Sequence, residues 1–433
     1  MENFCIKVKN TLLSLISQME SSCADFVNAP GHDFTRKSTL SFSCTMRFLL
    51  SMGGGSLNRE LAEYFDFSAD TVSVSALVQR RSKIRPEAFS HLLKSFNNCF
   101  PSEKLFCGRR LLSVDGSDID IPHDPSDNDS FIKWRDDKKG YNLLHLNALY
   151  DLTDKRYYSA VVQPFRKKNE HSALIEMIDS LDLPQGSIIV ADRNYESYNN
   201  IETLRNKSLC YVIRVKKSGV TKNFVLPESE EFDIDSEILL SRKQKKEFMD
   251  NKAKYRYLPK NVNFPFLPPG SSELYPMSFR VVRFRISEDT YETLITNLPR
   301  DEFGIMQLKE IYRMRWGIET SFRELKYSIG LNAFHAKKRD FIEQEMYARM
   351  IMYNFSMLIT EHIEVPKQKG KHMTQLNITA AIHVCMSYLK SDKIDPAELE
   401  KLIARRTLPV RPDRHYKRKN RGRSAVSLNY RIM

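Results

Sequence analysis

The chain has 433 residues, of which 67 are Lys or Arg and 54 are Asp or Glu, so its net charge is +13. Its 41% hydrophobic and 28% charged residues exclude a wholly disordered chain, and its 15 Gly and 18 Pro exclude collagen-like and low-complexity proteins. The length allows roughly two or three domains, and the positive charge predicts a polyanionic partner, either nucleic acid or an acidic membrane surface.

Residues 1–105 are predicted to form a helical N-terminal DNA-binding domain. Apolar spacing predicts helices at 57–65, at 72–84 and from Pro86 onward. The second helix ends in four cations, Arg80, Arg81, Lys83 and Arg85. Two interpretations stay open, namely a helix-turn-helix-like DNA-binding unit and a helical bundle with a solvated basic end. The segment 53–56 lacks the Lys-Ser/Thr pair of a phosphate-binding loop and is interpreted as a linker.

Residues 106–335 are predicted to form a mixed α/β catalytic core. Short apolar runs predict strands at 110–115, 143–150, 157–162, 186–192 and 210–215. Helical patterns at 171–181 and from about residue 197 separate the later strands. Three consecutive strands followed by strand–helix–strand are typical of a mixed sheet that is flanked by helices.

The remainder of the chain is divided by its composition. Residues 216–298 are predicted to be a β-rich insertion, in which charged and Pro-rich stretches precede two alternating strands at 278–286 and 293–297. Helices resume near residue 301, and 336–400 is predicted to be a helical C-terminal region with a strongly apolar helix at 346–363. Residues 401–433 form a basic tail that carries +10 of the +13, and we expect it to be a disordered arm making sequence-independent phosphate contacts.

Cysteine usage and hydropathy indicate the compartment. The seven Cys are dispersed, without a C-x-x-C pair, which argues against both a disulfide framework and a structural zinc site. The N-terminus has too short an apolar run for a secretion signal, and the best apolar stretch, 350–360, is interrupted by Asn354 and Ser356. We therefore expect a soluble intracellular protein without membrane contact.

Two aspartates follow predicted core strands. Asp115 ends the apolar run Leu-Leu-Ser-Val, and Asp192 ends the run Ile-Ile-Val-Ala. A carboxylate at the end of a core strand lies at the edge of the sheet, where a site can form. The ordinary alternative is that such an aspartate caps a helix or begins a turn. Asp118 and Asp120 are the reserve candidates for the first acid, although both point to the other face if the strand continues.

The predicted helix after Glu302 gathers polar and aromatic residues on one face. At about 100° per residue, an arc of roughly 100° holds Tyr312, Arg315, Trp316, Glu319, Arg323 and Lys326. Apolar residues occupy the opposite side, so that side is expected to face the core. A salt-bridged solvated face is the alternative, but such faces rarely expose both a Trp and a Tyr. A single carboxylate among cations and aromatics suits a metal ligand beside phosphates and unstacked bases.

Asp115, Asp192 and Glu319 would together supply hard oxygen ligands for Mg²⁺ or Mn²⁺. Two such ions can activate a water or a 3′-hydroxyl on one side of a phosphodiester and stabilise the leaving oxygen on the other. None of the ten His and seven Cys residues has a spacing that predicts a competing metal site.

The helix sequence Tyr312-x2-Arg315-x3-Glu319-x6-Lys326 resembles the Y-R-E-K motif of bacterial insertion-sequence DDE transposases, in the branch that excises through DNA hairpins. The stretch 114–117, Val-Asp-Gly-Ser, resembles the first-acid motif of that family. The stretch 191–195, Ala-Asp-Arg-Asn-Tyr, resembles its second-acid motif, with Asn194 where Gly is usual. The stretch 296–299 resembles the strand that leads into the third motif, and the resemblance covers about residues 40–365.

This resemblance implies a ribonuclease-H-like core with a β-rich insertion between the second Asp and the Glu. It implies that the three acids hold two Mg²⁺ or Mn²⁺ ions per site. It further implies a DNA-contacting set, in which Trp316 stacks on a displaced base or hairpin: Tyr312, Arg315, Trp316, Arg323, Lys326 and Arg193. The implied partners are the terminal inverted repeats of the element and target DNA, bound by a homodimer in a synaptic complex. The implied location is the prokaryotic cytoplasm, in association with the nucleoid.

The predicted function is therefore metal-dependent cut-and-paste DNA transposition, with end cleavage, a hairpin intermediate and strand transfer. One alternative is another ribonuclease-H-like nuclease, which would need the three acids but would not join a pre-cut 3′-end to target DNA. A second alternative is a catalytically silent DNA-binding protein derived from a transposase, against which the three intact acids argue.

Overall fold

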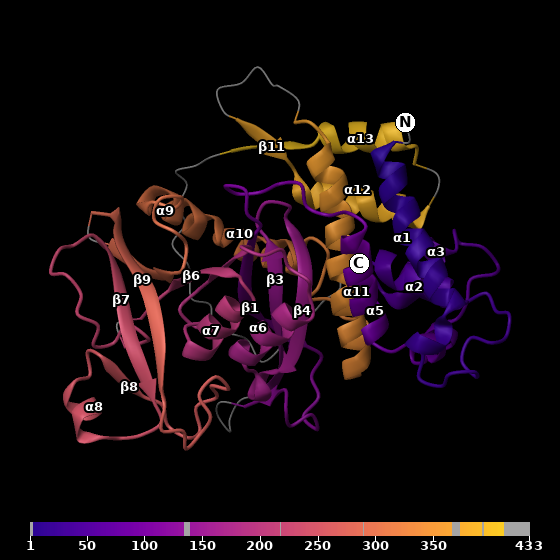
Figure 1. The fold of residues 1–433 in the computed structure, drawn as a ribbon. Coiled ribbons are helices and arrows are strands. Elements are labelled where there is room, and N and C mark those ends of the chain that lie inside the picture. The colour runs from indigo at the N-terminus through magenta and orange to yellow at the C-terminus, as the bar shows by residue number, and fades with distance from the viewer. Residues whose placement is uncertain are drawn as a thin grey trace.

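The computed structural model describes residues 3–133, 139–216, 218–288, 290–365, 373–391 and 394–410. Figure 1 shows a helical part on one side, a sheet in the middle and a β-rich part on the other side. The expected mixed α/β fold is confirmed. Most of the predicted basic tail, residues 411–433, lies outside the described residues.

The helical part joins both ends of the described chain. Its N-terminal helices are α1 (Phe4–Ser21), α2 (Phe42–Ser51), α3 (Leu57–Tyr64), α4 (Val74–Arg81) and α5 (Glu87–Asn98). Its C-terminal helices are α11 (Arg339–His362), α12 (Ile378–Lys390) and α13 (Pro396–Ala404). Serine side chains cap α2, α3 and α4 by accepting a backbone N–H of the first turn, which explains where these helices begin.

The apolar helix predicted at 346–363 is the centre of this bundle. It is α11, and it packs against α1, α2, α5 and α12 as well as against the sheet. Because α11 is surrounded on nearly every side, it is apolar around most of its circumference rather than along one stripe. The N-terminal and C-terminal helices therefore share one core, and the proposed boundaries at 105 and 336 stay a prediction about domains.

The core sheet begins with five strands in a fixed order. They are β1 (Leu111–Ile121), β3 (Tyr141–Asp151), β4 (Arg156–Pro164), β5 (Ile188–Ala191) and β6 (Cys210–Arg214). The spatial order is β4-β3-β1-β5-β6, with antiparallel pairing among the first three and parallel pairing of β1, β5 and β6. This arrangement agrees with the mixed sheet that the sequence predicted from three consecutive strands followed by strand–helix–strand. A short strand, β2 (Phe131–Ile132), pairs with the start of β3.

The β-rich insertion extends the same sheet beyond β6. It comprises β7 (Phe232–Ser241), α8 (Lys246–Asp250), β8 (Tyr255–Tyr257), β9 (Leu274–Ser287) and β10 (Thr290–Thr296). The order continues β6-β10-β9-β7-β8, so β10 connects the insertion to the core. The sequence did not predict β7, because its apolar alternation is short and is interrupted by acidic residues and Ser236.

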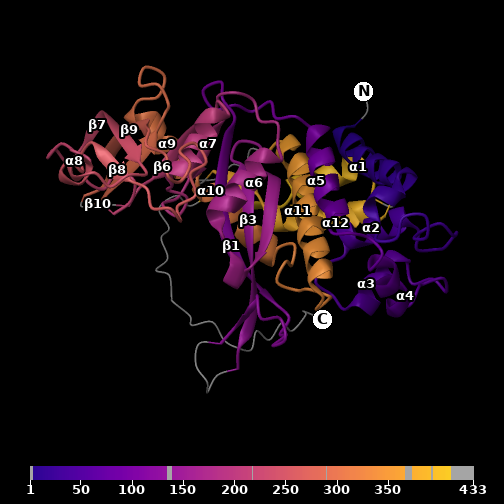
Figure 2. The same cartoon turned by 60° about the horizontal axis from the view of Figure 1, so that its bottom comes forward.

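Helices cover both faces of the core sheet (Figure 2). One face is covered by α6 (Glu170–Asp179) and α7 (Tyr198–Asn206), which pack with apolar side chains of β1 and β5. The other face is covered by α9 (Ile305–Met314), α10 (Trp316–Tyr327) and α11. Two short strands, β11 (Thr374–Leu376) and β12 (Thr407–Pro409), pair next to the C-terminal helices.

Three sequence-based expectations are corrected by these elements. The strand predicted to end at Asp115 continues as β1 to Ile121, because β3 pairs with it along its full length. The tail predicted to be disordered from 401 contains the end of α13 and all of β12. The segment predicted to be a linker, 53–56, is packed around the buried carboxylate of Glu60, which accepts a hydrogen bond from the Gly55 amide at 3.0 Å.

No helix among the described residues combines the length and the apolar character that crossing a membrane would require.

Candidate active site

Asp115 and Asp192 are neighbours because of strand register. The strands β1 and β5 run parallel, and Val114 pairs with Ala191. An aspartate follows each of these two residues, Asp115 within β1 and Asp192 directly after β5, so both lie where β5 ends. Asp115 is therefore not at the end of its own strand, as the sequence predicted, but at the end of its neighbour. Because of this register, the two aspartates still lie together at the edge of the parallel strands, where the sequence predicted a site.

The helix α10 brings a third carboxylate and a cation to the same place. Its residue Glu319 lies one turn after Arg315, which separates α9 from α10. The Arg315 guanidinium donates to Glu319 Oε1 at 2.9 Å and to Asp115 Oδ2 at 3.4 Å. Arg315 is only 5% exposed, and its Nε has no hydrogen-bond partner among the residues that the structure describes. The guanidinium thus links Glu319, one turn away on its own side of the chain, to Asp115, which lies 200 residues before Arg315 in the sequence.

The electrostatic environment disfavours a charged Asp115. Burial raises the pKa of the Asp115 carboxyl to about 7, although the Gly116 amide and the Arg315 charge act in the opposite direction. The negative charges of Asp192 and Glu319 raise this pKa further. Asp115 and Glu319, which share the cation Arg315, and Asp192, which raises the Asp115 pKa, form a site that would be stabilised by additional positive charge.

The aromatic residues of the predicted motif flank Arg315. Its guanidinium lies 5.6 Å from the Tyr312 ring centre and 5.2 Å from the Trp316 ring centre. Trp316 is 51% exposed, whereas Tyr312 is 7% exposed. The exposed indole is available to stack on a partner, while the phenol ring holds the guanidinium in place.

An ion pair that the sequence did not predict lies beside these aromatic residues. Arg214, at the end of β6, pairs with Glu292 on β10. Glu292 is buried, and its burial raises the pKa of its carboxyl against the effect of the Arg214 and Arg315 charges. The two residues come from strands that are about 80 positions apart, so no local motif could have indicated them.

Lys326 reaches the strand that carries the first acid. Its ammonium group donates to Ser117 Oγ and to the Asp118 carbonyl oxygen, both at 2.8 Å. It therefore connects the last turn of α10 to β1, two and three residues past Asp115. Lys326 lies next to the predicted site, as the motif implied.

The loop after β5 orients the second acid. Asp192 Oδ1 accepts the Asn194 amide at 2.8 Å, and Lys216 donates to the Asn194 side chain at 3.4 Å. Asn194 occupies the position where the related motif usually has Gly. The fully buried Tyr195 lies nearby, and its hydroxyl has no hydrogen-bond partner in the structure. Arg193 is exposed on the same loop.

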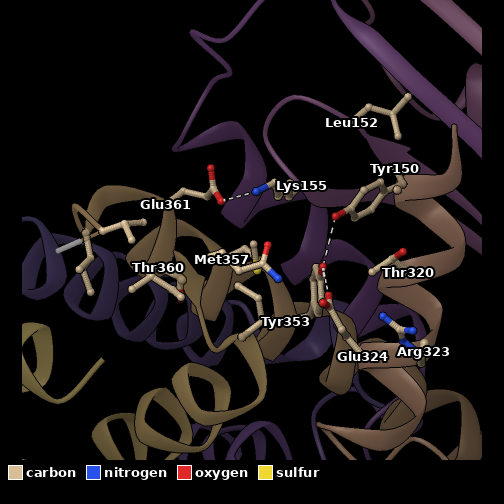
Figure 3. A pocket seen from close by; sticks show the side chains of 16 residues that line it. Tyr150, Leu152, Lys155, Thr320, Arg323, Glu324, Tyr353, Met357, Thr360 and Glu361 are labelled. Atoms are coloured by element: carbon tan, nitrogen blue, oxygen red, sulfur yellow. Dashed lines mark hydrogen bonds and ion pairs between the residues drawn. The ribbon is translucent and has the colours of Figure 1, made fainter. Parts of the chain in front are cut away.

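Arg323 is placed differently from the other residues of the predicted arc. It lines a cavity of about 490 Å³ between α10 and α11, whose polar lining includes Lys155, Glu324 and Glu361 (Figure 3). In that cavity the Tyr353 hydroxyl donates to Glu324 Oε2 at 2.9 Å. No contact between Arg323 and the three acids is found among the described residues, so its role in DNA contact stays a prediction.

The reserve candidates for the first acid face away from the site. Because β1 continues past Gly116, Asp118 points to the α6 side, where it contacts His145 Nδ1 at 2.7 Å. His145 also contacts Glu170 Oε1 at 3.1 Å. The two acids raise the pKa of this imidazole although its burial acts to lower it. This polar cluster was not predicted, because Asp118 and His145 are brought together by β-sheet pairing and Glu170 is added by the packing of α6.

The donor atoms fit a divalent metal ion in their chemistry. Carboxylate oxygens are the ligands that Mg²⁺ and Mn²⁺ prefer, and burial together with the charges of Asp192 and Glu319 raises the pKa of Asp115, so a cation bound there would favour its charged form. Among the described residues, no group of three or more His, Cys, Asp or Glu side chains lies close enough together to hold one ion. Arg315 occupies the space between Asp115 and Glu319 and partly supplies the missing charge.

The sequence matches a known protein family and several curated proteins. The family described as a transposase DDE domain matches residues 107–355, which span β1, β5 and α10. A putative transposase InsL of insertion element IS186A from Escherichia coli is 36% identical over 58 residues. That alignment covers 13% of this chain and 16% of the relative.

Two further relatives are also transposases of insertion elements and also align over only a short part of their length. A transposase of insertion element IS421 from Escherichia coli is 36% identical over 58 residues, or 13% of this chain and 16% of the relative. A putative transposase of element IS4SA from Synechocystis is 33% identical over 99 residues, or 22% of this chain and 28% of the relative. The chain thus matches less than a third of the length of each of these relatives.

A structural neighbour is the piggyBac transposase in a synaptic complex with hairpin DNA. The TM-score is 0.44 at 9% sequence identity, and the alignment covers 92% of this chain and 84% of that chain.

Proposed function

The chain belongs to the transposase DDE domain family, and on that premise we propose that it catalyses metal-dependent cut-and-paste DNA transposition. The observation that carries the proposal is that Arg315 contacts both Asp115 and Glu319, while strand register brings Asp192 next to Asp115. Val114 pairs with Ala191 on the parallel strands, and an aspartate follows each of these two residues. The match of residues 107–355 to the family confirms the family predicted from the sequence, while the Y-R-E-K motif stays a prediction.

Asp115, Asp192 and Glu319 are the proposed ligands of two Mg²⁺ or Mn²⁺ ions. Such ions, when bound, would activate the attacking water or 3′-hydroxyl and stabilise the leaving oxygen. Arg315, whose guanidinium already contacts two of the acids, would move onto a terminal phosphate of the DNA. Movement of Arg315 would also free its two partner carboxylates for the ions.

The remaining motif residues are proposed to hold the DNA end. Lys326 would contact a neighbouring phosphate from its position beside Ser117, and Arg193 would contact the backbone from the exposed loop after β5. Trp316, which exposes half of its surface, would stack on a displaced base. A displaced base is required if the freed 3′-hydroxyl attacks the opposite strand to form a hairpin. The proposed partners are the element ends and target DNA, bound by a homodimer.

The test is cleavage of DNA that carries the element ends, with Mg²⁺ or Mn²⁺ and the purified full chain. Three single variants, Asp115→Asn, Asp192→Asn and Glu319→Gln, should each abolish cleavage while DNA binding is retained. The matched control is Asp120→Asn, which makes the same change on β1 but on its other face. Full activity of all three variants, or loss of activity in the control alone, would overturn the site assignment.

A second substrate separates transposition from simple nuclease activity. A DNA end that is already cut and has a free 3′-hydroxyl should be joined to target DNA by the parent chain. Cleavage without any joined product would instead indicate a ribonuclease-H-like nuclease. Binding without either reaction would indicate a silent DNA-binding protein.

A further inference from the structure

A basic groove lies on the helical part of the molecule, formed by the loop 32–38 and the helix α4. It encloses about 500 Å³, and three cations line it, Arg36, Arg80 and Lys83. Thr35, Ser38 and Gln79 add uncharged hydrogen-bonding groups to the lining. Such a combination of cations and small polar groups is typical of a surface that contacts phosphates.

The wall of this groove is held in shape by an aromatic contact. Phe34 has φ of +59°, a left-handed backbone conformation that residues with a Cβ rarely adopt. The ring of Phe34 packs edge-on against Phe42, with 5.7 Å between ring centres. The Arg80 guanidinium lies 5.5 Å from the centre of the same Phe34 ring. The strained loop thus positions Arg80 before any ligand arrives.

The charge in the groove is only partly balanced. Asp33 pairs with Lys83, with 3.0 Å between the oxygen and the ammonium nitrogen. The other oxygen of Asp33 accepts the Ala29 amide at 3.0 Å, so this carboxylate also fixes the loop. Within the described part of the chain, neither Arg36 nor Arg80 forms an ion pair with a carboxylate. The groove therefore keeps a positive charge.

The groove is connected rigidly to the rest of the protein. Arg81, which follows Arg80, is buried and donates to Glu345 Oε1 at 2.9 Å and to the Phe341 carbonyl oxygen at 2.9 Å. These contacts fasten α4 to α11, the central helix of the bundle. Figure 2 shows α4 and α10 on opposite sides of α11. The groove and the three acids therefore belong to one framework but to separate surfaces.

We propose that this groove binds the phosphate backbone of duplex DNA as a second contact, remote from the catalytic carboxylates. The inference rests on the proposed function for its choice of DNA as the partner. It assigns Arg36 and Arg80 to direct phosphate contact, and Phe34 to positioning of Arg80. Because the ligand is the backbone, the contact is independent of base sequence.

The experiment compares two charge-matched double variants of the full chain. Arg36→Gln with Arg80→Gln removes the two groove cations. Lys7→Gln with Lys37→Gln removes two exposed cations of the same helical part that do not line the groove. Binding of a duplex of about 30 base pairs is measured by fluorescence anisotropy from about 50 to about 300 mM salt, the range in which phosphate contacts respond to salt. The measurement gives both the affinity and its salt dependence.

The groove variant should bind at least about tenfold more weakly at low salt, and its slope of log affinity against log salt should fall by about two. The loss should be equal for element-end DNA and for a scrambled duplex. The control variant should keep the affinity and the slope of the parent chain. Equal losses in both variants would overturn the proposal, since they would reflect overall charge.

Three further measurements keep the result interpretable. Unchanged melting temperature of the groove variant shows that a loss of binding is not a loss of folding. If inorganic phosphate raises the melting temperature of the parent but not of the groove variant, and duplex affinity is unchanged, the groove binds free anions and the proposal is wrong. At saturating DNA, cleavage by the groove variant should equal that of the parent. If no protein cleaves, the proposed function fails while the binding comparison still tests the groove.

Discussion

At the scale of single residues, Arg315 has the most to explain, because its guanidinium contacts both Asp115 and Glu319. Arg315→Lys keeps the charge but lacks the planar fork with which the guanidinium, once it has left the two carboxylates, would bind a terminal phosphate. We expect single-turnover cleavage at saturating DNA and metal to fall about 100-fold or more in this variant. Arg313→Lys, an exposed position on α9, is the control and should cleave normally. Normal cleavage by Arg315→Lys would show that charge alone suffices.

The buried carboxyl of Glu345 is expected to make the folding stability of the protein depend on pH. Burial acts to raise the pKa of this carboxyl, but a hydrogen bond from His335 and the charges of Arg81, His335 and Arg349 lower it to about 2. Since the folded-state pKa lies below the ordinary 4.5, the charged form contributes stability that is fully present above pH 4.5 and is lost as the pH falls toward 2.

The predicted contribution of Glu345 is on the order of 3 kcal/mol. Urea unfolding of the parent chain between pH 6 and pH 3 should show a declining free energy of unfolding as the pH drops. In Glu345→Gln the decline should be shallower in this window, and the variant should already be less stable at pH 6. Identical pH dependence of the two proteins would contradict the assignment.

At the scale of elements, the end of β7 holds a loop of the insertion through one side chain. Arg242 is 7% exposed, and its guanidinium donates to the carbonyl oxygens of Pro259 at 2.7 Å and Leu267 at 2.9 Å, among others. Arg242→Met roughly keeps the volume of the side chain but leaves these oxygens without a donor. We therefore expect the free energy of unfolding to fall by about 3 kcal/mol. Hydrogen exchange should increase in 258–267 before it increases in the core strands.

The segment 53–55 provides a second test at this scale. A Cβ at Gly55 would lie 2.9 Å from Glu60 Oε1, and that carboxylate is held by the Gly55 amide and by Lys390. Gly55→Ala should therefore destabilise the fold by about 1–3 kcal/mol. At Gly54 the nearest atom to an added Cβ is 3.7 Å away, so Gly54→Ala should be tolerated. Equal melting temperatures of the two variants would support the earlier linker interpretation.

How far the sequence predicts the structure differs between local and long-range features. The core strands, the helices α6, α10 and α11, and the acids Asp115, Asp192 and Glu319 all carry local signals of apolar runs or of helical spacing. The pair of Arg214 with Glu292 and the cluster around His145 carry none, because each depends on strands that meet only in the folded sheet. The same reason explains why β1 was predicted too short.

At the scale of the whole molecule, the positive charge of the chain has two parts with different structural roles. Residues 411–433 contain eight Lys or Arg and one acid, Asp413, whereas 401–409 belong to the folded protein through α13 and β12. Deletion of 411–433 should therefore weaken DNA binding and reduce its salt dependence, because phosphate contacts release counterions. Cleavage at saturating DNA should be unchanged.

A longer deletion tests the boundary between these two parts. Removal of 401–433 takes away Ile403, which is 1% exposed, and the strand that pairs with β11. This variant should lose about 2–4 kcal/mol of folding stability in addition to DNA affinity. Thermal unfolding and anisotropy of the two deletions, measured side by side, separate the two effects. If the protein stays stable after the longer deletion, α13 contributes little to the helical core. If cleavage at saturating DNA is lost after the shorter deletion, residues 411–433 act in the catalytic assembly.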